Sequence, residues 1–340
     1  MYLICFGTRP EIIKLIPLIN KFKEKKINFV TLFSGQHENL IKDFYKYIDK
    51  PDYILENIME HNQTLNKLIS KILINMDRIL TNSNISKIIV QGDTSTAYAV
   101  ALSGFHNKKM VYHLEAGLRT NDKYSPYPEE LNRRMISQIA DVHLCPTKKS
   151  VDNLKNENIE NNVYLVGNTI VDAYEYILKK ESNNEYIKNL LKGSYFVVTL
   201  HRRENRGERM LKMWNELIEI SKSYNIVYIT HPSLPESREI FKDKKIELLE
   251  PLNYEDMVHL ISKSAGIITD SGGLQEEAVC ANKNVLICRD TTERPETIDC
   301  GLGKLVDTNI KENIKFLLES KNKVENPYGK DVCDKIMKIL

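Results

Sequence analysis

Residues 2–34 read YLICFGTRPEIIKLIPLINKFKEKKINFVTLFS, and this stretch decides the fold class. It opens with the apolar run Tyr2–Phe6 and closes with a second one, Phe29–Ser34, both of strand length and composition. Between them, a T-x-x-E capping box ends at Glu11 with a proline in its first turn, which predicts a helix over Glu11–Lys25. A strand, a helix and a strand in this order predict a βαβ unit with parallel strands.

The same alternation continues along the rest of the chain. Strands that are spaced by helices pair in parallel sheets that are covered on both faces. Two series of about six strands predict an α/β protein with two Rossmann-like, doubly wound halves, although their count alone leaves a (β/α)₈ barrel open. The further strand candidates are Lys87–Gln91, Met110–Leu114, Val142–Cys145, Val163–Val166, Tyr195–Leu200, Ile226–Thr230, Ile246–Leu249, Gly266–Thr269, Val285–Cys288 and Lys304–Val306, and the further helix candidates are Thr64–Leu80, Arg209–Ser223, Asp256–Lys263 and Ile310–Glu319.

A chain of 340 residues is long enough for two domains, each with its own core. The strand VYLVG ends near Gly167, and the polar stretch Lys179–Lys192 follows early in the second half. No Pro- or Ser-rich linker separates the halves, so we expect them to touch and to form a cleft. The predicted domains are residues 1–167 and residues 168–327, and the final stretch NPYGKDVCDKIMKIL predicts a terminal helix.

The composition excludes several classes of partner. Lys and Arg total 48 against 46 Asp and Glu, a formal net charge of +2, whereas nucleic acids and anionic membranes require a clustered cationic excess. No apolar run approaches the roughly 18 residues of a membrane-spanning helix, and the start MYLICFGTRPE lacks the basic lead of a secretory signal. We therefore expect a cytoplasmic protein that binds neither nucleic acid nor membrane. The 6 cysteines form no C-x-x-C pair, and no nicotinamide fingerprint or D-x-D motif occurs, so no disulfide framework, metal or cofactor is expected.

Glycine and arginine are used sparingly. The chain has 14 glycines, and 12 of its 48 basic residues are arginine. Ten of these arginines lie in or beside polar motifs, where a planar guanidinium suits two-point contact with phosphate or carboxylate. The sequence therefore predicts an anion-binding site.

Polar clusters follow the predicted strands of the first half, at the ends where open α/β sheets bind ligands. FGTRPEIIK places Arg9 and Lys14 at a helix start. This pattern has two interpretations of about equal weight, a well-capped helix with no further role and an anion-binding site. The segments IIVQGDTSTA, VYHLEAGLRT and SPYPEELNRRM supply the acids Asp93, Glu115 and Glu129. Each acid taken alone is more often a helix cap or a first-turn residue than a catalytic group. The H-x-E of HLE has no third ligand at a plausible spacing, so zinc is not expected.

The second half ends its strands in phosphate-type groups. VVTLHRREN supplies His201 and Arg202, and RDTTERPE supplies Arg294. GIITDSGGLQEEA places Gly272 and Gly273 at a helix start, where backbone N–H groups can approach a phosphate closely. Carboxylates thus gather in the first half, and groups that suit phosphate binding gather in the second. A cleft between the halves is therefore predicted to hold a nucleotide diphosphate on the side of the second half and the reacting group on the side of the first.

Taken together, these motifs resemble those of the non-hydrolysing UDP-N-acetylglucosamine 2-epimerases. The resemblance runs in order through GTRPEIIK, SGQH, GDTSTA, HLEAGLRT, SPYPEELNR, HRREN, TDSGGLQEEA, RDTTERPE and NPYG, and covers essentially the whole chain. It implies a GT-B architecture, with two Rossmann-like domains that face a deep cleft, a helix over residues 328–340 that crosses back to the first domain, and UDP bound mainly by the second. It also implies a homodimer and a product for polysaccharide biosynthesis.

The resemblance also implies a reaction and roles for the matching residues. UDP leaves by anti elimination to give a 2-acetamidoglucal, and its re-addition returns the proton to the other face of carbon 2, so that UDP-N-acetylglucosamine and UDP-N-acetylmannosamine interconvert. The expected catalytic residues are Asp93, Glu115, Glu129 and His201. The residues expected to bind UDP are Arg9, Lys14, His201, Arg202, Ser271, Gly272, Gly273, Glu277 and Arg294.

Many members of the family bind a second substrate molecule as an activator. Gln36, His37 and His231 match positions of that activator site. The arginine expected beside them is replaced, around Lys71, and ITHPSLPE departs from the family pattern after His231. Both departures argue against activation by substrate.

Three other activities remain open. A hydrolysing epimerase would release UDP and free N-acetylmannosamine from the same intermediate, although RDTTERPE and HRREN favour the non-hydrolysing branch. A 2-epimerase of a modified sugar, such as a UDP-2,3-diacetamido uronic acid, would use the same ring chemistry. A GT-B glycosyltransferase would share the fold, but several acids at the sugar argue against it.

Overall fold

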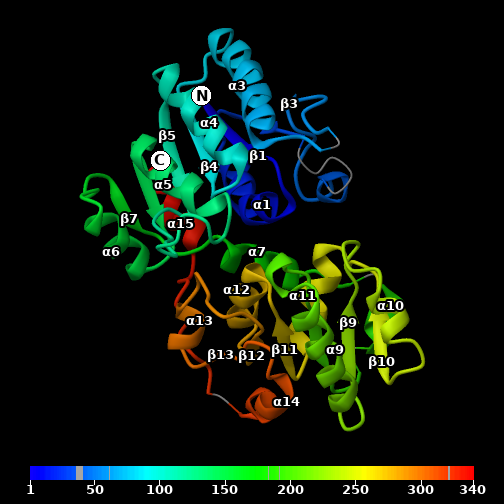
Figure 1. The fold of residues 1–340 in the computed structure, drawn as a ribbon. Coiled ribbons are helices and arrows are strands. Elements are labelled where there is room, and N and C mark those ends of the chain that lie inside the picture. Colours follow the sequence, from blue (N-terminus) through cyan, green and yellow to red (C-terminus); the bar gives the residue numbers. More distant parts are fainter. Residues whose placement is uncertain (36–40, 61, 183, 191, 321) are drawn as a thin grey trace. The chain divides into compact units, whose positions relative to one another are not determined.

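The computed structural model describes residues 1–340 apart from 36–40, 61, 183, 191 and 321. Its internal contacts divide the described residues into two compact units (Figure 1). Unit 1 comprises Met1–Ala173 and Tyr328–Leu340, and unit 2 comprises Tyr174–Pro327. In the described part of the chain, we find no helix with the length and apolar character needed to cross a membrane.

Unit 1 is built on a parallel sheet of seven strands in the order β3-β2-β1-β4-β5-β6-β7. The chain starts in the middle of this sheet and winds outward in both directions, which is the doubly wound topology. The strands are β1 (Tyr2–Phe6), β2 (Phe29–Phe33), β3 (Tyr53–Ile54), β4 (Lys87–Gln91), β5 (Met110–Leu114), β6 (Val142–Cys145) and β7 (Val163–Leu165). The helices are α1 (Arg9–Glu24), α3 (Leu65–Thr81), α4 (Ser95–His106), α5 (Glu129–Ile139), α6 (Lys148–Asn156), α15 (Val332–Met337) and the start of α7 (Ile170–Leu178), with a 3₁₀ turn at η1 (Lys42–Phe44).

The first βαβ unit forms as its sequence predicts. All five residues of β1 are buried, and β1 pairs in parallel with both β2 and β4. Helix α1 begins directly after its N-cap Thr8, which forms a capping box with Glu11 in the first turn, and the helix buries its apolar face. The central strands therefore read as continuous apolar runs because both faces of the sheet are covered.

Residues 328–340 complete unit 1 although they follow unit 2 along the chain. The backbone N–H of Asn168 donates to the carbonyl of Tyr328 at 2.9 Å, and Gly167, at φ +101°, lies so close that a β-carbon there would be 2.4 Å from that carbonyl oxygen. The carboxylate of Asp172 accepts the first N–H groups of α15, at 3.1 and 2.6 Å. Helix α15 is therefore docked through its N-terminus, as orphan helix N–H groups require.

Unit 2 has a second doubly wound parallel sheet, of six strands in the order β10-β9-β8-β11-β12-β13. The strands are β8 (Phe196–Thr199), β9 (Ile226–Ile229), β10 (Ile246–Leu249), β11 (Gly266–Thr269), β12 (Val285–Ile287) and β13 (Gly303–Leu305). The helices are the end of α7, α8 (Glu185–Leu190), α9 (Glu208–Ile220), α10 (Ser237–Ile240), α11 (Tyr254–Lys263), α12 (Gly272–Cys280), α13 (Glu296–Asp299) and α14 (Ile310–Asn313), with 3₁₀ turns at η2 (Arg203–Asn205) and η3 (Ile314–Leu318).

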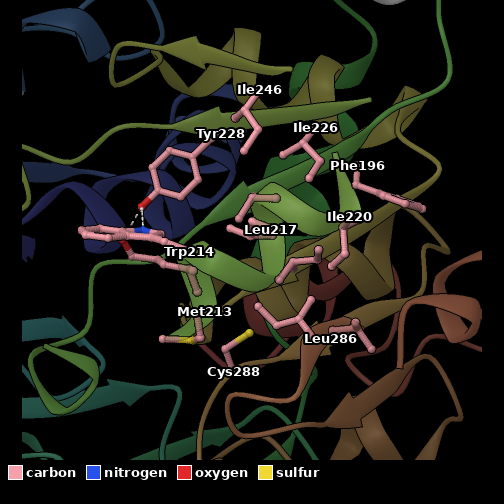
Figure 2. Packing of buried hydrophobic residues seen from close by; sticks show 14 of the residues in the cluster. Phe196, Met213, Trp214, Leu217, Ile220, Ile226, Tyr228, Ile246, Leu286 and Cys288 are labelled. Carbon is pink, nitrogen blue, oxygen red and sulfur yellow. Dashed lines mark hydrogen bonds between the residues drawn. The ribbon is translucent and has the colours of Figure 1, made fainter. Parts of the chain in front are cut away.

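The core of unit 2 lies between α9 and the strands that it covers (Figure 2). Trp214 is buried there, and its indole N–H donates to the hydroxyl of Tyr228 at 3.1 Å, which satisfies both polar groups inside the core. Phe241 packs on both rings, at centroid distances of 6.0 Å from Trp214 and 4.9 Å from Tyr228.

The two sheets exclude the barrel that the count of strands had left open, and they confirm the α/β, Rossmann-like class. Three local differences have physical reasons. Strand β3 was not predicted, because two residues at a sheet edge give no apolar run. The helix predicted over Ile310–Glu319 is α14 followed by the 3₁₀ turn η3. The terminal helix is confined to α15, since Asp331 before it has a left-handed backbone at φ +50°.

Candidate active site

Because all strands of a parallel sheet point the same way, their carboxyl ends share one edge, where ligands of such folds bind. In unit 1 this edge carries Asp93 and Glu115 after the neighbouring strands β4 and β5. In unit 2 the same edge carries His201 after β8 and Asp270 after β11, which are also neighbours. Two of the predicted catalytic acids thus lie at adjacent strand ends of one unit.

Asp93 rests on a buried arginine. Both Nε and Nη2 of Arg133, on α5, donate to Asp93 Oδ2, at 3.0 and 2.5 Å. The Arg133 side chain is 4% exposed and that of Asp93 is 23% exposed. Nη1 of Arg133 also donates to the fully buried Glu130 at 3.0 Å, and the side-chain amide of Asn132 donates to the Asp93 carbonyl at 2.9 Å. Two N–H groups of one buried guanidinium therefore fix the position of the Asp93 carboxylate.

Glu115 is held by one donor from helix α1 and one from the end of strand β4. Its Oε2 accepts Lys14 Nζ at 2.5 Å and Gln91 Nε2 at 2.7 Å. Its backbone is left-handed at φ +63°, which costs a non-glycine residue roughly 1–2 kcal/mol. Two residues earlier, the buried His113 bonds the Gly92 carbonyl through Nε2 at 2.8 Å, and burial lowers its pKa to about 3, so the ring is neutral and donates this bond. Backbone strain at a polar strand end is typical of functional sites.

Glu11 joins two of the strand-end loops. Its buried carboxylate accepts the N–H groups of Gly7 (3.0 Å) and Thr8 (2.7 Å) and the Thr8 hydroxyl (2.7 Å) from the loop before α1. It also accepts the hydroxyl of Thr94, the residue after Asp93, at 2.8 Å. Burial raises the pKa of Glu11 to about 7, although these hydrogen bonds oppose the shift. Two further predicted residues begin helices here and are half-buried: Arg9 is the first residue of α1, and Glu129 is the first residue of α5.

In unit 2, a buried carboxylate holds the HRREN segment. Asp270 accepts the backbone N–H groups of His201 (3.1 and 3.0 Å to its two oxygens) and Arg202 (2.9 Å) and the Asn205 amide (3.0 Å). Nδ1 of His201 lies 3.6 Å from Asp270 Oδ1, and the His231 ring stacks on the His201 ring at a centroid distance of 5.0 Å. The predicted activator residue His231 therefore contacts a predicted catalytic one, while Gln36 and His37 lie outside the described residues.

The SGG segment forms the N-terminus of α12. Ser271 precedes the helix and donates its N–H to the Thr269 hydroxyl at 2.9 Å. A β-carbon at Gly272 would lie 2.5 Å from Nη1 of Arg294, whereas one at Gly273 would meet nothing within 4 Å. The first glycine thus makes room for a side chain, and the second leaves open space at a helix N-terminus, as an anion site requires.

Arg294 is anchored by acids. Its Nε donates to the buried Glu276 at 2.7 Å, and its Nη1 donates to Glu293. Nη1 of Arg289 donates to the other oxygen of Glu293 at 2.8 Å. Although burial acts in the opposite direction, the guanidinium groups of Arg294 and Arg289 lower the pKa of Glu293 well below its usual value. Glu277, which is expected at the ribose, directly follows Glu276 in α12 and is also buried.

Sequence reasoning missed the residues that hold the predicted ones. Gln91, Arg133 and Asp270 each bond a predicted catalytic residue, yet none was assigned a role from the sequence. Arg133 carried a signal, as one of the scarce arginines in a polar motif. The signal for Asp270 was its place directly after a strand, next to the SGG segment.

Comparison with known proteins decides the family. A family model described as UDP-N-acetylglucosamine 2-epimerase matches residues 20–340. The chain belongs to the UDP-N-acetylglucosamine 2-epimerase family. Within this family, the UDP-N-acetylglucosamine 2-epimerase of Campylobacter jejuni is 39% identical to the chain, and the alignment covers 99% of this chain and 96% of the relative.

Solved structures of the family match the fold over nearly its full length. A putative UDP-N-acetylglucosamine 2-epimerase from Listeria monocytogenes matches with a TM-score of 0.93 at 35% identity, covering 99% of this chain and 94% of that one. The enzyme of Neisseria meningitidis, solved with UDP-GlcNAc bound, matches with a TM-score of 0.91 at 35% identity, covering 99% and 98%. MurG of Acinetobacter baumannii, at 11% identity and a TM-score of 0.58, shares the fold alone. The expected two-domain GT-B class of this epimerase family is confirmed.

Proposed function

We propose that this protein is a non-hydrolysing 2-epimerase that interconverts UDP-N-acetylglucosamine and UDP-N-acetylmannosamine. Its membership of the epimerase family supports the substrate class, as does the relative from Neisseria meningitidis that was solved with UDP-GlcNAc. The observation that carries the proposal is the arrangement of Asp93 and Glu115, two acids at neighbouring strand ends that each accept hydrogen bonds from a buried cation.

The chemistry explains why several acids are needed. The proton on carbon 2 of the sugar has no adjacent carbonyl to acidify it, so the bond from carbon 1 to the diphosphate oxygen must break well ahead of proton loss. UDP leaves with the electron pair of that bond, and a carboxylate takes the carbon-2 proton, which leaves a 2-acetamidoglucal. UDP then adds back to carbon 1, and a proton arrives on the opposite face of carbon 2.

In this scheme the carboxylates of unit 1 act on the sugar ring. A carboxylate near the ring favours the positive charge that develops on it, as in glycoside hydrolysis. A second carboxylate acts as the general base, an effect of roughly 10²–10⁴-fold. Asp93, Glu115 and Glu129 are the proposed set. The first two each accept hydrogen bonds from a basic side chain, Asp93 from Arg133 and Glu115 from Lys14.

Unit 2 acts on the leaving group. His201, Arg202 and the N–H groups at the start of α12 stabilise the negative charge that grows on the diphosphate, which is usually the largest catalytic effect. Arg9 and Lys14 of unit 1 and Arg294 of unit 2 complete the proposed diphosphate-binding set, and Glu277 accepts the ribose hydroxyls. Within the protein, Lys14 also donates to Glu115 and Arg294 also donates to Glu276.

Three further properties belong to the proposal. We propose a homodimer, which light scattering of the purified protein tests. We propose a cytoplasmic enzyme whose product enters polysaccharide biosynthesis. We also propose that activation by a second substrate molecule is weak, because the arginine expected near Lys71 is missing; a rate that rises steeply with substrate concentration would contradict this.

Proton NMR of the protein with UDP-N-acetylglucosamine in heavy water tests the reaction. We expect UDP-N-acetylmannosamine with deuterium at carbon 2 and with UDP still attached. Free UDP together with free N-acetylmannosamine would instead assign the protein to the hydrolysing branch. No exchange and no product would reject this substrate, and the same assay with a UDP-2,3-diacetamido uronic acid would then test the modified-sugar alternative.

A further inference from the structure

Asp270 is a fully buried carboxylate to which the reaction as proposed gives no role. Among the residues that the structure describes, its donors all belong to the segment after β8: the backbone N–H groups of His201 and Arg202 and the amide of Asn205, at 2.9 to 3.1 Å. The carboxylate therefore fixes the backbone that carries His201, across two neighbouring strands.

The same carboxylate also lies beside the His201 ring. Nδ1 lies 3.6 Å from Asp270 Oδ1, which is the distance of an ion pair rather than of a hydrogen bond. The ring of His231 covers one face of the His201 ring, with the two planes at 16° to each other. Because Nδ1 is the ring nitrogen close to Asp270, we infer that the opposite nitrogen, Nε2, is the one that meets a ligand.

The charges around this ring decide its protonation. Burial lowers the pKa of His201, and the carboxylate of Asp270 is the largest influence that raises it again. Three other groups act on the ring: His231 and Arg202 lower the pKa, and Glu204 raises it. Loss of the negative charge at position 270 therefore extends the neutral form of the imidazole to lower pH.

We propose that Asp270 is a positioning residue of the epimerase reaction, which turns Nε2 of His201 toward the leaving diphosphate and favours the imidazolium that donates to it. This inference rests on the proposed function, because it takes a diphosphate as the ligand of His201. As the bond from carbon 1 to oxygen breaks, its electron pair goes to the diphosphate, and the imidazolium keeps its proton while it stabilises that charge.

A carboxylate that only secured a loop would behave differently. Asparagine at position 270 keeps one oxygen acceptor for the backbone N–H groups but carries no charge. A purely structural role therefore predicts loss of stability with an unchanged titration of His201. A role through the ring predicts a changed titration, and a loss of ligand affinity that depends on pH.

The experiment compares the wild-type protein with Asp270→Asn by NMR of protein carrying labelled histidine, without substrate. His201→Asn identifies the signal of His201. We expect the titration midpoint of His201 to fall by about 1 unit or more in Asp270→Asn, as the loss of an opposite charge at this distance implies. The matched control is Thr199→Val, which removes a buried hydroxyl from the same sheet edge without changing charge and should leave the midpoint in place.

UDP binding, measured by calorimetry from pH 4.5 to pH 7.5, provides the second readout; this range extends below the usual pKa of histidine because burial lowers the pKa of His201. We expect Asp270→Asn to lower the affinity roughly tenfold or more, because a hydrogen bond from a charged group is weakened. The loss should grow with pH up to the wild-type midpoint and then level off, since the variant loses its imidazolium at lower pH than the wild type does. An unchanged midpoint, or an affinity loss that is equal at every pH, would overturn the inference.

A measurement on the unmodified protein keeps the inference testable if the variant does not fold. The neutral form of His201 should carry its proton on Nδ1, facing Asp270, and ¹⁵N chemical shifts distinguish this tautomer from the other. A proton on Nε2 would refute the inference. Both NMR readouts work without turnover, so a protein that fails to epimerise would reject the proposed function and leave this test intact.

Discussion

Asp93 in unit 1 and His201 in unit 2 both follow a strand of a doubly wound sheet, and both rest on a buried group of opposite character. Asp93 is 23% exposed above Arg133, which is 4% exposed. His201 is 32% exposed above Asp270, which is 0% exposed. The same edge of the same topology thus presents an acid held by a cation in one unit and a base held by an acid in the other.

The difference matches the two opposite tasks that we propose for the units. A buried charge without a partner is costly. The buried Arg133 and Asp270 are therefore each paired with the more exposed group that they hold, Asp93 and His201. In unit 1 the buried partners are Arg133 and Lys14, and the groups they hold can take up a proton. In unit 2 the buried partners are Asp270, Glu276 and Glu293, and the groups they hold can bind an anion.

The largest expected effect is on turnover through the acids of unit 1. Asp93→Asn and Glu115→Gln keep the shape of the side chains but cannot take up a proton, so we expect each to lower turnover by roughly 10²–10⁴-fold. Initial rates of UDP-N-acetylglucosamine epimerisation measure this. The control is Asp49→Asn, because Asp49 pairs with Lys23 at a side chain that is 87% exposed. Near-wild-type turnover in both site variants would remove the acids from the mechanism.

The second effect is on stability and tests the partner beneath Asp93. Arg133→Met leaves the fully buried Glu130 without one of its cations, so we expect the free energy of unfolding to fall by about 3–5 kcal/mol in urea titrations. Arg133→Met combined with Glu130→Gln should recover part of this loss, because the uncompensated charge is removed.

An exposed ion pair provides the control for that experiment. Arg238 pairs with Glu250, and their side chains are 52% and 72% exposed, so Arg238→Met should change the stability by no more than about 1 kcal/mol. Equal losses in Arg133→Met and Arg238→Met would show that burial of the partner does not distinguish the two sites.

The smallest effect separates the two glycines of unit 2. Gly272→Ala forces a β-carbon against Arg294, so we expect a loss of about 1–3 kcal/mol in the free energy of unfolding. Gly273→Ala meets nothing within 4 Å and should fold at least as stably as the wild type, yet it should bind UDP more weakly because its methyl group occupies the proposed phosphate site. Urea titration measures the stability of each variant, and calorimetry measures its affinity for UDP. If both variants lost stability and affinity to the same extent, the different roles assigned to the two glycines would be contradicted.

Much of the fold could be predicted from the sequence, because strands buried on both faces are continuous apolar runs. The predicted ends of these strands differ from the observed ones by one residue at most, as at Phe196–Thr199 against the predicted Tyr195–Leu200. The two-residue β3 offered no such run. The 3₁₀ turn of residues 314–318 has apolar spacing that resembles the end of an α-helix.

The site was less predictable, and sequence separation explains why. The acids carry local signals, since they directly follow strands. Their partners lie far away along the chain: Arg133 is 40 residues from Asp93, Lys14 is 101 residues from Glu115, and Asp270 is 69 residues from His201. Arg133 and Lys14 lie on α5 and α1, and Asp270 follows β11, the neighbour of the strand that precedes His201. These pairs therefore depend on a strand order that no local pattern encodes.

The return of residues 328–340 to unit 1 has a consequence for synthesis on the ribosome. Once residue 327 has emerged, unit 2 has every residue that it needs, whereas unit 1 still lacks α15 and the carbonyl that caps Asn168. Domains fold as units while the chain is made, usually with the N-terminal one first. Here the first unit to begin is the last to be completed. Until then, Gly167 and Asp172 lack the contacts that residues 328–340 make with them in the finished unit.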